Sequence, residues 1–221
     1  MAESIDVVDE LGRPLGARDR AAAHRAGDWH RVFHLLVVAQ RADGPVAVLQ
    51  RRAATKVVFP GLLDLTATGH LAAGERPVDG VRELREELGV DLDPAALVSL
   101  GVRRVVDDTP EGRNRELVHV HLALDDRPLS AYRPDPTEVD AVVELPLEAG
   151  LDLVHGRRPT VECHAVEVGR PPTSRLVTVA DLVPEPAAAT IAGEGSPGGG
   201  YWGVLLVMAV RLAGGDDRLA I

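Results

Sequence analysis

One run of residues, from Gly69 to Val90, constrains both the secondary structure and the chemistry of this chain. Within it, Glu83, Glu86 and Glu87 stand at positions i, i+3 and i+4. Residues at these spacings lie on the same face of a helix, so the three carboxylates are expected side by side. Like charges one turn apart destabilise a helix by a few tenths of a kcal/mol per pair. Such a cluster is therefore costly unless a cation lies within it.

The same segment carries an apolar face. Val81, Leu84 and Leu88 recur at helical spacing and point away from the carboxylates, as in a helix that packs against a core. A proline precedes this pattern and Gly89 follows it, which are the usual start and stop residues. The pattern predicts a helix over residues 77–88.

Oxygen-rich clusters of this kind suit hard divalent cations. Magnesium is usually held by one or two carboxylates together with substrate phosphates and water. The loop that begins at Gly69 and leads into the acidic helix therefore indicates a metal–phosphate site. Helix composition alone leaves open a solvated helix in which Arg82 pairs with Glu86. The ordered positions of Gly69, Glu75 and Gly89 favour the metal site.

These positions resemble the signature of the Nudix hydrolase superfamily, G-x5-E-x7-R-E-U-x-E-E-x-G-U, in which U is an aliphatic residue. Gly69 and Glu75 keep the first spacing, and residues 82–90 match the second half at every fixed position. Six residues instead of seven separate Glu75 from Arg82. This departure leaves the position of Glu75 open, but not that of the helix carboxylates.

The resemblance implies an α/β fold, specifically an α/β/α sandwich around a mixed β-sheet. The chain agrees, because strand-like runs surround one or two helices without regular alternation of strand and helix. We expect a domain over residues 1–156 that begins with an N-terminal hairpin, followed by a C-terminal extension over residues 157–221 that packs on this domain or projects from it. Within the extension, the pattern predicts a projecting hairpin (160–168 and 175–183), a flexible connector (185–200) and an apolar helix (201–212).

The composition limits the classes of molecule that this protein is expected to bind. A net charge of −10 excludes a protein that binds nucleic-acid backbones through its overall field. Cys163 is the only cysteine, so there is no disulfide framework. The longest apolar run, residues 204–210, is too short to span a bilayer, and the N-terminus lacks a signal region. We expect a cytoplasmic protein that acts on a small diphosphate, with no membrane or nucleic-acid partner. Association into a homodimer is left open.

Residues outside the signature resemble the isopentenyl-diphosphate-isomerase-like branch of the superfamily, which contains both isomerases and diphosphatases. The matching segments are 9–16, 50–52, 59–64 and 68–70. True isomerases of this branch bind a metal through histidines and glutamates and protonate an alkene with a cysteine–glutamate pair. The positions similar to those ligands and that glutamate are His24, His30, His70 and Glu116.

Two departures argue against isomerisation. Thr68 stands where the isomerases have their cysteine, and a hydroxyl is a poor acid for protonating carbon. Asn114 stands where a second glutamate is expected. In addition, the true isomerases are degenerate in the acidic helix, which is complete here. The resemblance therefore favours hydrolysis. His24 and His30 are interpreted as structural or exposed residues.

The expected reaction is magnesium-dependent cleavage of a diphosphate linkage in a small nucleoside-diphosphate-type substrate. One to three Mg²⁺ ions, which Mn²⁺ can replace, are expected on the acidic helix. A glutamate then takes a proton from a bound water. The alternatives are an isopentenyl-diphosphate isomerase-like enzyme and a non-catalytic diphosphate-binding module. The candidate metal ligands are Glu83, Glu86, Glu87, Glu75 and the backbone near Gly69; the catalytic candidates are Glu83, Glu86 and Glu116, with Glu83 or Glu116 as the base; the substrate-binding candidates are Arg51, Arg52, His70 and Arg104.

Overall fold

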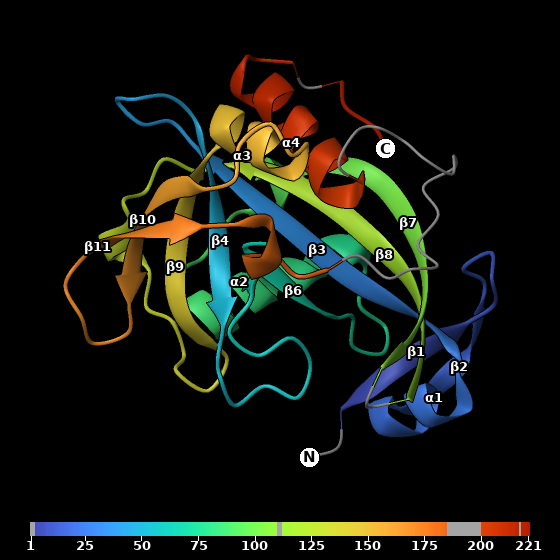
Figure 1. Ribbon diagram of the computed structural model, residues 1–221. Coiled ribbons are helices and arrows are strands. Elements are labelled where there is room, and N and C mark those ends of the chain that lie inside the picture. Colours follow the sequence, from blue (N-terminus) through green and yellow to red (C-terminus); the bar gives the residue numbers. More distant parts are fainter. Residues whose placement is uncertain (1–2, 110–111, 185–199, 217) are drawn as a thin grey trace.

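The structure is a computed structural model that describes residues 3–109, 112–184, 200–216 and 218–221. Its strands join in one mixed sheet, whose main path runs β11-β10-β9-β4-β3-β1-β2 (Figure 1). The strands are β1 (Ser4–Val8), β2 (Pro14–Asp19), β3 (Trp29–Ala39), β4 (Val46–Arg52), β5 (Leu63–Asp64), β6 (Ala67–His70), β7 (Val98–Thr109), β8 (Gly112–Leu124), β9 (Val139–Pro146), β10 (Val161–Glu167) and β11 (Thr173–Val177). The α-helices are α1 (Arg20–Ala26), α2 (Arg82–Leu88), α3 (Leu147–Val154) and α4 (Gly200–Ala213).

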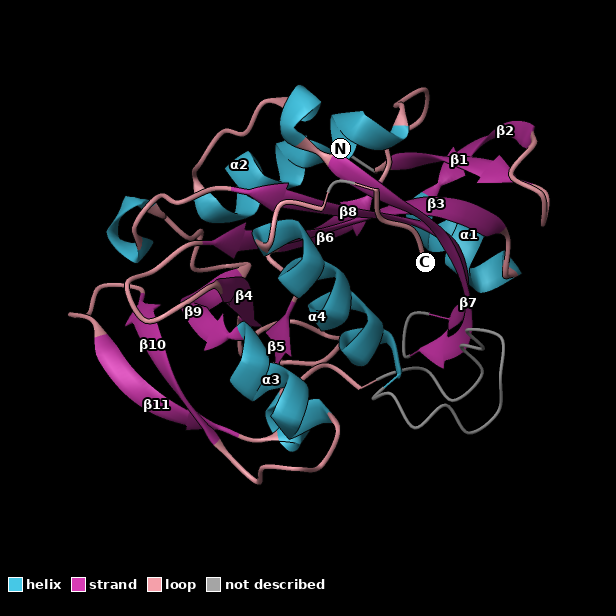
Figure 2. Cartoon of the chain, turned by 90° about the horizontal axis from the view of Figure 1, so that it is seen from above, coloured by secondary structure: helices cyan, strands magenta, loops and turns pink. Residues whose placement is uncertain are grey.

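Strand β3 organises the sheet. It pairs in parallel with β8 on one side; on the other it is antiparallel to β6 and then to β4. Its successive side chains point to opposite faces, and both faces are apolar, which is typical of a strand covered on both sides. Leu36 packs in the cluster that contains α3 and α4, whereas Phe33 packs in the cluster that contains α2. Figure 2 shows these helices on opposite sides of the sheet. The expected α/β/α arrangement is confirmed.

The acidic helix begins later than the spacing predicts. Residues Pro77–Val81 form a 3₁₀ helix, and regular α-helix begins at Arg82. Close packing constrains this first part, because a Cβ added at Gly80 would lie 2.5 Å from the Phe33 side chain. The helix ends as expected, with Gly89 in the left-handed conformation at φ 66°.

The C-terminal extension is part of the same sheet. Its hairpin, β10 and β11, was expected to project, but β10 pairs with β9 along residues 164–167, so the hairpin widens the sheet at its edge. Helix α4 buries Leu205, Leu206 and Ala209 in the core that includes α3. The connector predicted over residues 185–200 lies outside the described residues, except for Gly200, which opens α4. No helix in the described ranges is long and apolar enough to cross a membrane.

The predicted N-terminal hairpin is present as β1 and β2, and β1 also pairs with the start of β3. Helix α1 follows directly. The Asp19 side chain caps its first turn by accepting a hydrogen bond from the Ala22 N–H, and Gly27 ends it at φ 70°. These caps fix α1 beside the sheet, where it contacts β8. His24, on this helix, is thereby held close to β3.

Candidate functional site

A cavity of about 980 Å³ lies where β6, α2, β8 and the extension meet. Its wall includes Glu83 and Glu87 from α2 on one face of the sheet and Tyr201 and Trp202 from α4 on the other. The cavity therefore reaches both faces. The sheet allows this because the strand beside β3 changes along its length. β3 pairs with β6 through Val32–Leu35 and with β4 only from Val37 onward.

The three glutamates of α2 all line this cavity, as their spacing predicts, but their environments differ. The Glu86 side chain is half exposed, whereas Glu87 is buried. An Oε of Glu87 accepts a hydrogen bond of 3.0 Å from the Gln50 side-chain amide on β4. Gln50 is itself buried, so it fixes the orientation of the Glu87 carboxylate.

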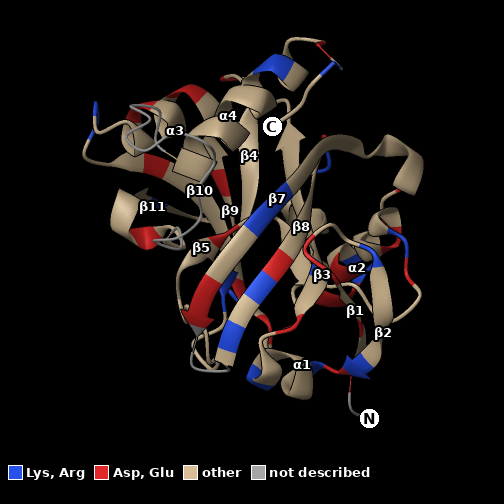
Figure 3. Ribbon diagram, turned by 90° about the vertical axis from the view of Figure 1, so that its right-hand side faces the viewer, with Lys and Arg blue, Asp and Glu red and all other residues tan. Residues whose placement is uncertain are grey.

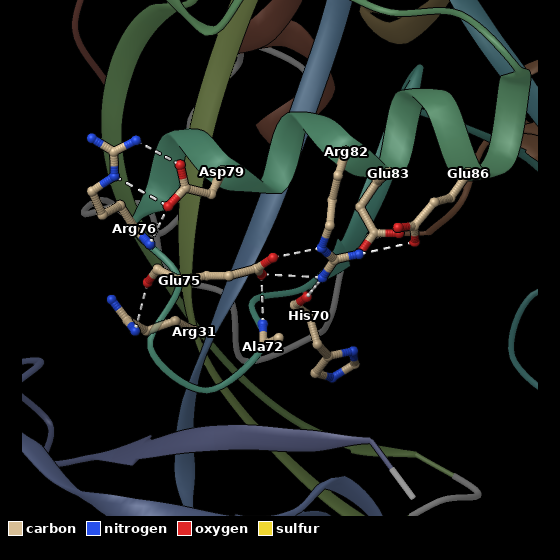
Figure 4. Close-up of polar contacts among 9 residues, drawn as sticks. All are labelled: Arg31, His70, Ala72, Glu75, Arg76, Asp79, Arg82, Glu83 and Glu86. Carbon is tan, nitrogen blue, oxygen red and sulfur yellow. Dashed lines mark hydrogen bonds and ion pairs between the residues drawn. The ribbon is translucent and has the colours of Figure 1, made fainter. Parts of the chain in front are cut away.

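Arg82 connects the loop to the helix (Figure 4). Its guanidinium donates to both Glu75 carboxylate oxygens, at 2.6 and 3.1 Å, and to the His70 carbonyl oxygen at 2.9 Å. Its Nη1 donates to Glu83 at 2.6 Å and to Glu86 at 3.0 Å. Bidentate contacts of this kind fix geometry strongly. Glu75 thus acts through Arg82 and does not line the cavity.

Gly69 lies directly against Glu83. A Cβ at position 69 would be 2.3 Å from the Glu83 carboxylate carbon, so any side chain there would displace this carboxylate. Only a residue without a Cβ allows Glu83 to lie beside the β6 backbone. The glycine of the sequence motif is therefore explained by close approach, without a positive φ.

Substitution Gly69→Ala is expected to lower kcat about a hundred-fold, because a displacement of about 1 Å at a reacting centre has effects of that size. Turnover and the midpoint of thermal unfolding would be measured together. Gly214→Ala is the matched control, since a Cβ there meets only ordinary contacts at 3.4 Å or more. Wild-type turnover in Gly69→Ala would show that the position of Glu83 does not matter.

The raised pKa values of the buried carboxylates favour a bound cation between them. Burial raises the pKa of Glu83 to about 7, and burial together with the neighbouring Glu83 raises that of Glu87 to about 8. Two desolvated carboxylates beside a third favour their neutral forms unless positive charge is added. Their oxygens are the donors that magnesium prefers. The donor set therefore fits a divalent metal ion.

Three histidines meet beside the cavity, and two of them, His24 and His70, line it. His24 on α1, His30 on β3 and His70 on β6 place one ring nitrogen each within 4.8 Å of one another. The Nδ1 of His30 lies 2.9 Å from the Asp28 carbonyl oxygen; as a donor there, it leaves Nε2 as the lone-pair atom. Burial lowers the pKa of His30 to about 4 and that of His70 well below its usual range. Neutral imidazoles clustered in this way can hold a metal ion.

Glu116, on β8, lines the cavity beside these histidines. One of its carboxylate oxygens lies 3.9 Å from the Nε2 of His30. Burial raises the pKa of Glu116 to about 7. The interpretation of His24 and His30 as structural or exposed is therefore wrong as to exposure, because both are buried and face His70.

The structure brings some of the predicted substrate-binding residues to the cavity and not others. Arg52 and His70 line it; Arg52 also pairs with Asp64 at 3.1 Å. Arg51 instead pairs with Glu167 on β10 at 3.1 Å. Arg104 is half exposed, lies over the Trp29 ring and approaches Glu10 at 3.3 Å. Neither Arg51 nor Arg104 is part of the cavity wall. Because side chains alternate along a strand, the adjacent residues Arg52 and Arg103 face the cavity instead.

Sequence reasoning missed two polar residues of the site. Gln50, which orients Glu87 from behind the cavity wall, lies in a strand whose apolar pattern indicates only burial. Arg103, which lines the cavity, directly precedes the predicted Arg104. The alternation of β7 is the one signal that could have selected Arg103, once the register with β8 was known.

Comparisons with known proteins identify the family of this chain. The family model described as NUDIX domain matches residues 29–162. An uncharacterized Nudix hydrolase of Clostridium acetobutylicum is 31% identical over 146 residues, which is 66% of this chain and 71% of that protein. An isopentenyl-diphosphate Delta-isomerase of Nocardia farcinica is 42% identical over 140 residues, 61% of this chain and 74% of that protein.

A solved structure supports the fold independently. A protein from Deinococcus radiodurans superposes with a TM-score of 0.52 at 24% identity, covering 66% of this chain and 85% of that one. At this identity the likeness concerns the fold alone.

Proposed function

The chain belongs to the Nudix superfamily, and from that membership we propose that it is a magnesium-dependent hydrolase that cleaves the diphosphate linkage of a small nucleoside-diphosphate-type substrate. The observation that supports this most strongly is the complete acidic set of α2 on the cavity wall: Glu83, Glu86 and Glu87. Buried carboxylates such as Glu87 are costly unless positive charge compensates them, and the metal ion of such a hydrolase would supply that charge.

In the proposed site, the three glutamates of α2 and the backbone near Gly69 would hold the metal. Bound Mg²⁺ would neutralise charge on the diphosphate oxygens and lower the pKa of a water molecule. Arg82, held by Glu75, keeps the Glu83 and Glu86 carboxylates in position. Gln50 does the same for Glu87.

Two carboxylates are candidates to accept the proton of the attacking water. Glu83 lies on the metal helix beside Gly69, and Glu116 lies across the cavity on β8. Each lies among groups that can orient a carboxylate, with Arg82 beside Glu83 and His30 beside Glu116. A general base must come within hydrogen-bond reach of the water, directly or through one water.

A second candidate function is isomerisation of an isopentenyl-type diphosphate. The cluster of His24, His30 and His70 beside Glu116 supports it, as does the relative named as an isomerase. Thr68 weighs against it: this residue lines the cavity where the resemblance implies a cysteine. A third candidate, a non-catalytic binding module, would bind diphosphates with magnesium and release no product.

The test is an assay of the purified protein with Mg²⁺ against nucleoside diphosphates, sugar nucleotides and isopentenyl diphosphate, with products resolved by mass. We expect cleavage of a nucleoside-diphosphate-type compound into two phosphorylated products or a monophosphate and phosphate. An unchanged mass with a shifted double bond would support the isomerase. Binding without product across the panel would support the binding module.

A further inference from the structure

Arg103 is a buried arginine in the cavity wall whose role the hydrolytic chemistry does not explain. It lies on β7 with 8% of its surface exposed. Its Nε and Nη2 atoms have no hydrogen-bond partner among the described residues. By contrast, Arg52 and Lys56 in the same wall are paired with Asp64 and Glu138. A buried guanidinium with two unused donors on one edge is costly unless a ligand meets it.

The C-terminal extension holds this side chain in place. The guanidinium carbon of Arg103 lies 3.9 Å from the centre of the Tyr201 ring, at the start of α4. The Tyr201 hydroxyl in turn lies 3.0 Å from Nδ1 of the half-buried ring of His34 on β3. Stacking on an aromatic face fixes the plane of a guanidinium and leaves its N–H edge available for an acceptor.

Strand register separates Arg103 from the carboxylate helix. His70 pairs with Val32, Val32 with Val118, and Val118 with Arg103. Three strand spacings of about 4.8 Å therefore lie between β6, which contacts α2, and Arg103. Arg103 also shares the sheet face of α4, opposite the face covered by α2. In Figure 3, β7 and β8 carry both basic and acidic residues along their length.

We propose that Arg103, oriented by Tyr201, binds a phosphate group of the substrate at the end of the cavity remote from the carboxylate helix. The free Nε–Nη2 edge matches two oxygens of one phosphate, which is the bidentate contact that arginine makes best. The phosphate at this position is a different one from the diphosphate that Glu83, Glu86 and Glu87 of α2 face. The preferred substrates therefore carry an additional phosphate beyond the scissile linkage.

This inference rests on the proposed hydrolase function for the class of ligand, but its first test does not require turnover. Inorganic phosphate is titrated into the metal-free protein at constant ionic strength, and binding is followed by NMR. We expect binding to weaken about ten- to hundred-fold in Arg103→Gln, because a charge-assisted pair is lost. Glu87→Gln should bind phosphate at least as well as wild type.

Three further variants serve as controls for misfolding. Arg113→Gln removes an exposed arginine from the same β7–β8 hairpin and should bind phosphate as wild type does. Tyr201→Leu should weaken binding and Tyr201→Phe should restore most of it, because the ring and not the hydroxyl supports the guanidinium. Equal phosphate affinity in wild type and Arg103→Gln, or no phosphate binding by wild type, would overturn the proposal.

Turnover then tests substrate choice. NADH and NADPH both contain a diphosphate linkage and differ by one ribose phosphate. We expect wild type to favour the compound with the additional phosphate in kcat/KM, and Arg103→Gln to lose that preference mainly through KM. An unchanged preference in Arg103→Gln would contradict the assignment. Failure of wild type to cleave either compound, with Arg103-dependent phosphate binding intact, would count against the hydrolase and not against the phosphate site.

Discussion

Replacing Glu87 with glutamine is expected to reduce turnover about a thousand-fold while leaving the fold intact. Metal-assisted stabilisation of a transition state is worth several kcal/mol, and each 1.4 kcal/mol corresponds to a factor of ten. Glutamine has nearly the same shape as glutamate and can still accept the hydrogen bond from Gln50. It cannot supply the negative charge. The measurement is kcat with saturating Mg²⁺ on the substrate found in the mass-resolved assay.

The companion variant is Glu86→Gln, which should also lose most activity although Glu86 is half exposed. Glu148→Gln is the matched control, because Glu148 is an exposed glutamate on α3 outside the cavity. Circular dichroism and thermal unfolding would check that each variant folds. Full activity in both Glu86→Gln and Glu87→Gln would rule out the acidic helix as the metal site.

The second large effect concerns stability without metal. The folded-state pKa values of Glu83, Glu87 and Glu116 are raised to about 7, 8 and 7. Between the ordinary glutamate pKa and these values, the folded state binds more protons than the unfolded state. The free energy of unfolding therefore falls as pH rises through this window. For Glu87 alone the loss is a few kcal/mol.

Buried histidines act in the opposite direction at lower pH. The pKa values of His30 and His119 are lowered to about 4, so these rings contribute a gain in stability as pH rises toward 6.5. The effect of the glutamates is therefore clearest between about pH 7.5 and 8.5, where histidines are largely neutral in both states. Urea unfolding of the metal-free protein should show stability decreasing across that range.

Two comparisons make this result specific. Glu87→Gln should flatten the decrease, because it removes the group with the highest raised pKa of the three. Excess Mg²⁺ should restore stability at pH 8, since a ligand that binds only the folded state stabilises it. Metal-free stability that stays constant or rises between pH 7.5 and 8.5 would contradict the raised pKa values of the buried carboxylates.

The local parts of the fold could be predicted from the sequence because their signals are short in range. Helical spacing and the glycine stop defined the end of α2, and turn residues defined the N-terminal hairpin. The start of α2 was predicted too early, since the contact between Gly80 and Phe33 is a tertiary effect. The pairing of β10 with β9 was missed for the same reason. Strand-like runs do not say which other strand they join.

The residues of the candidate site likewise fall into two groups: those that a local pattern predicts and those that only tertiary contacts bring together. Glu83, Glu86 and Glu87 belong to one helix, so their spacing alone placed them on one face. The cluster of His24, His30 and His70 draws on three elements, and its two outer members are 46 residues apart. Only the register of β3 with β6 and β8 brings those rings together with Glu116. Arg103 and Tyr201 are farther apart still in the chain, and no local pattern connects them.

The most direct test of the account is to run the best substrate in water enriched in ¹⁸O, with wild type, with and without Mg²⁺. The proposed function predicts one ¹⁸O atom in a single phosphorylated product, formed only when Mg²⁺ is present. An isomer of unchanged mass and a shifted double bond, or labelled product that does not depend on a divalent cation, would contradict it.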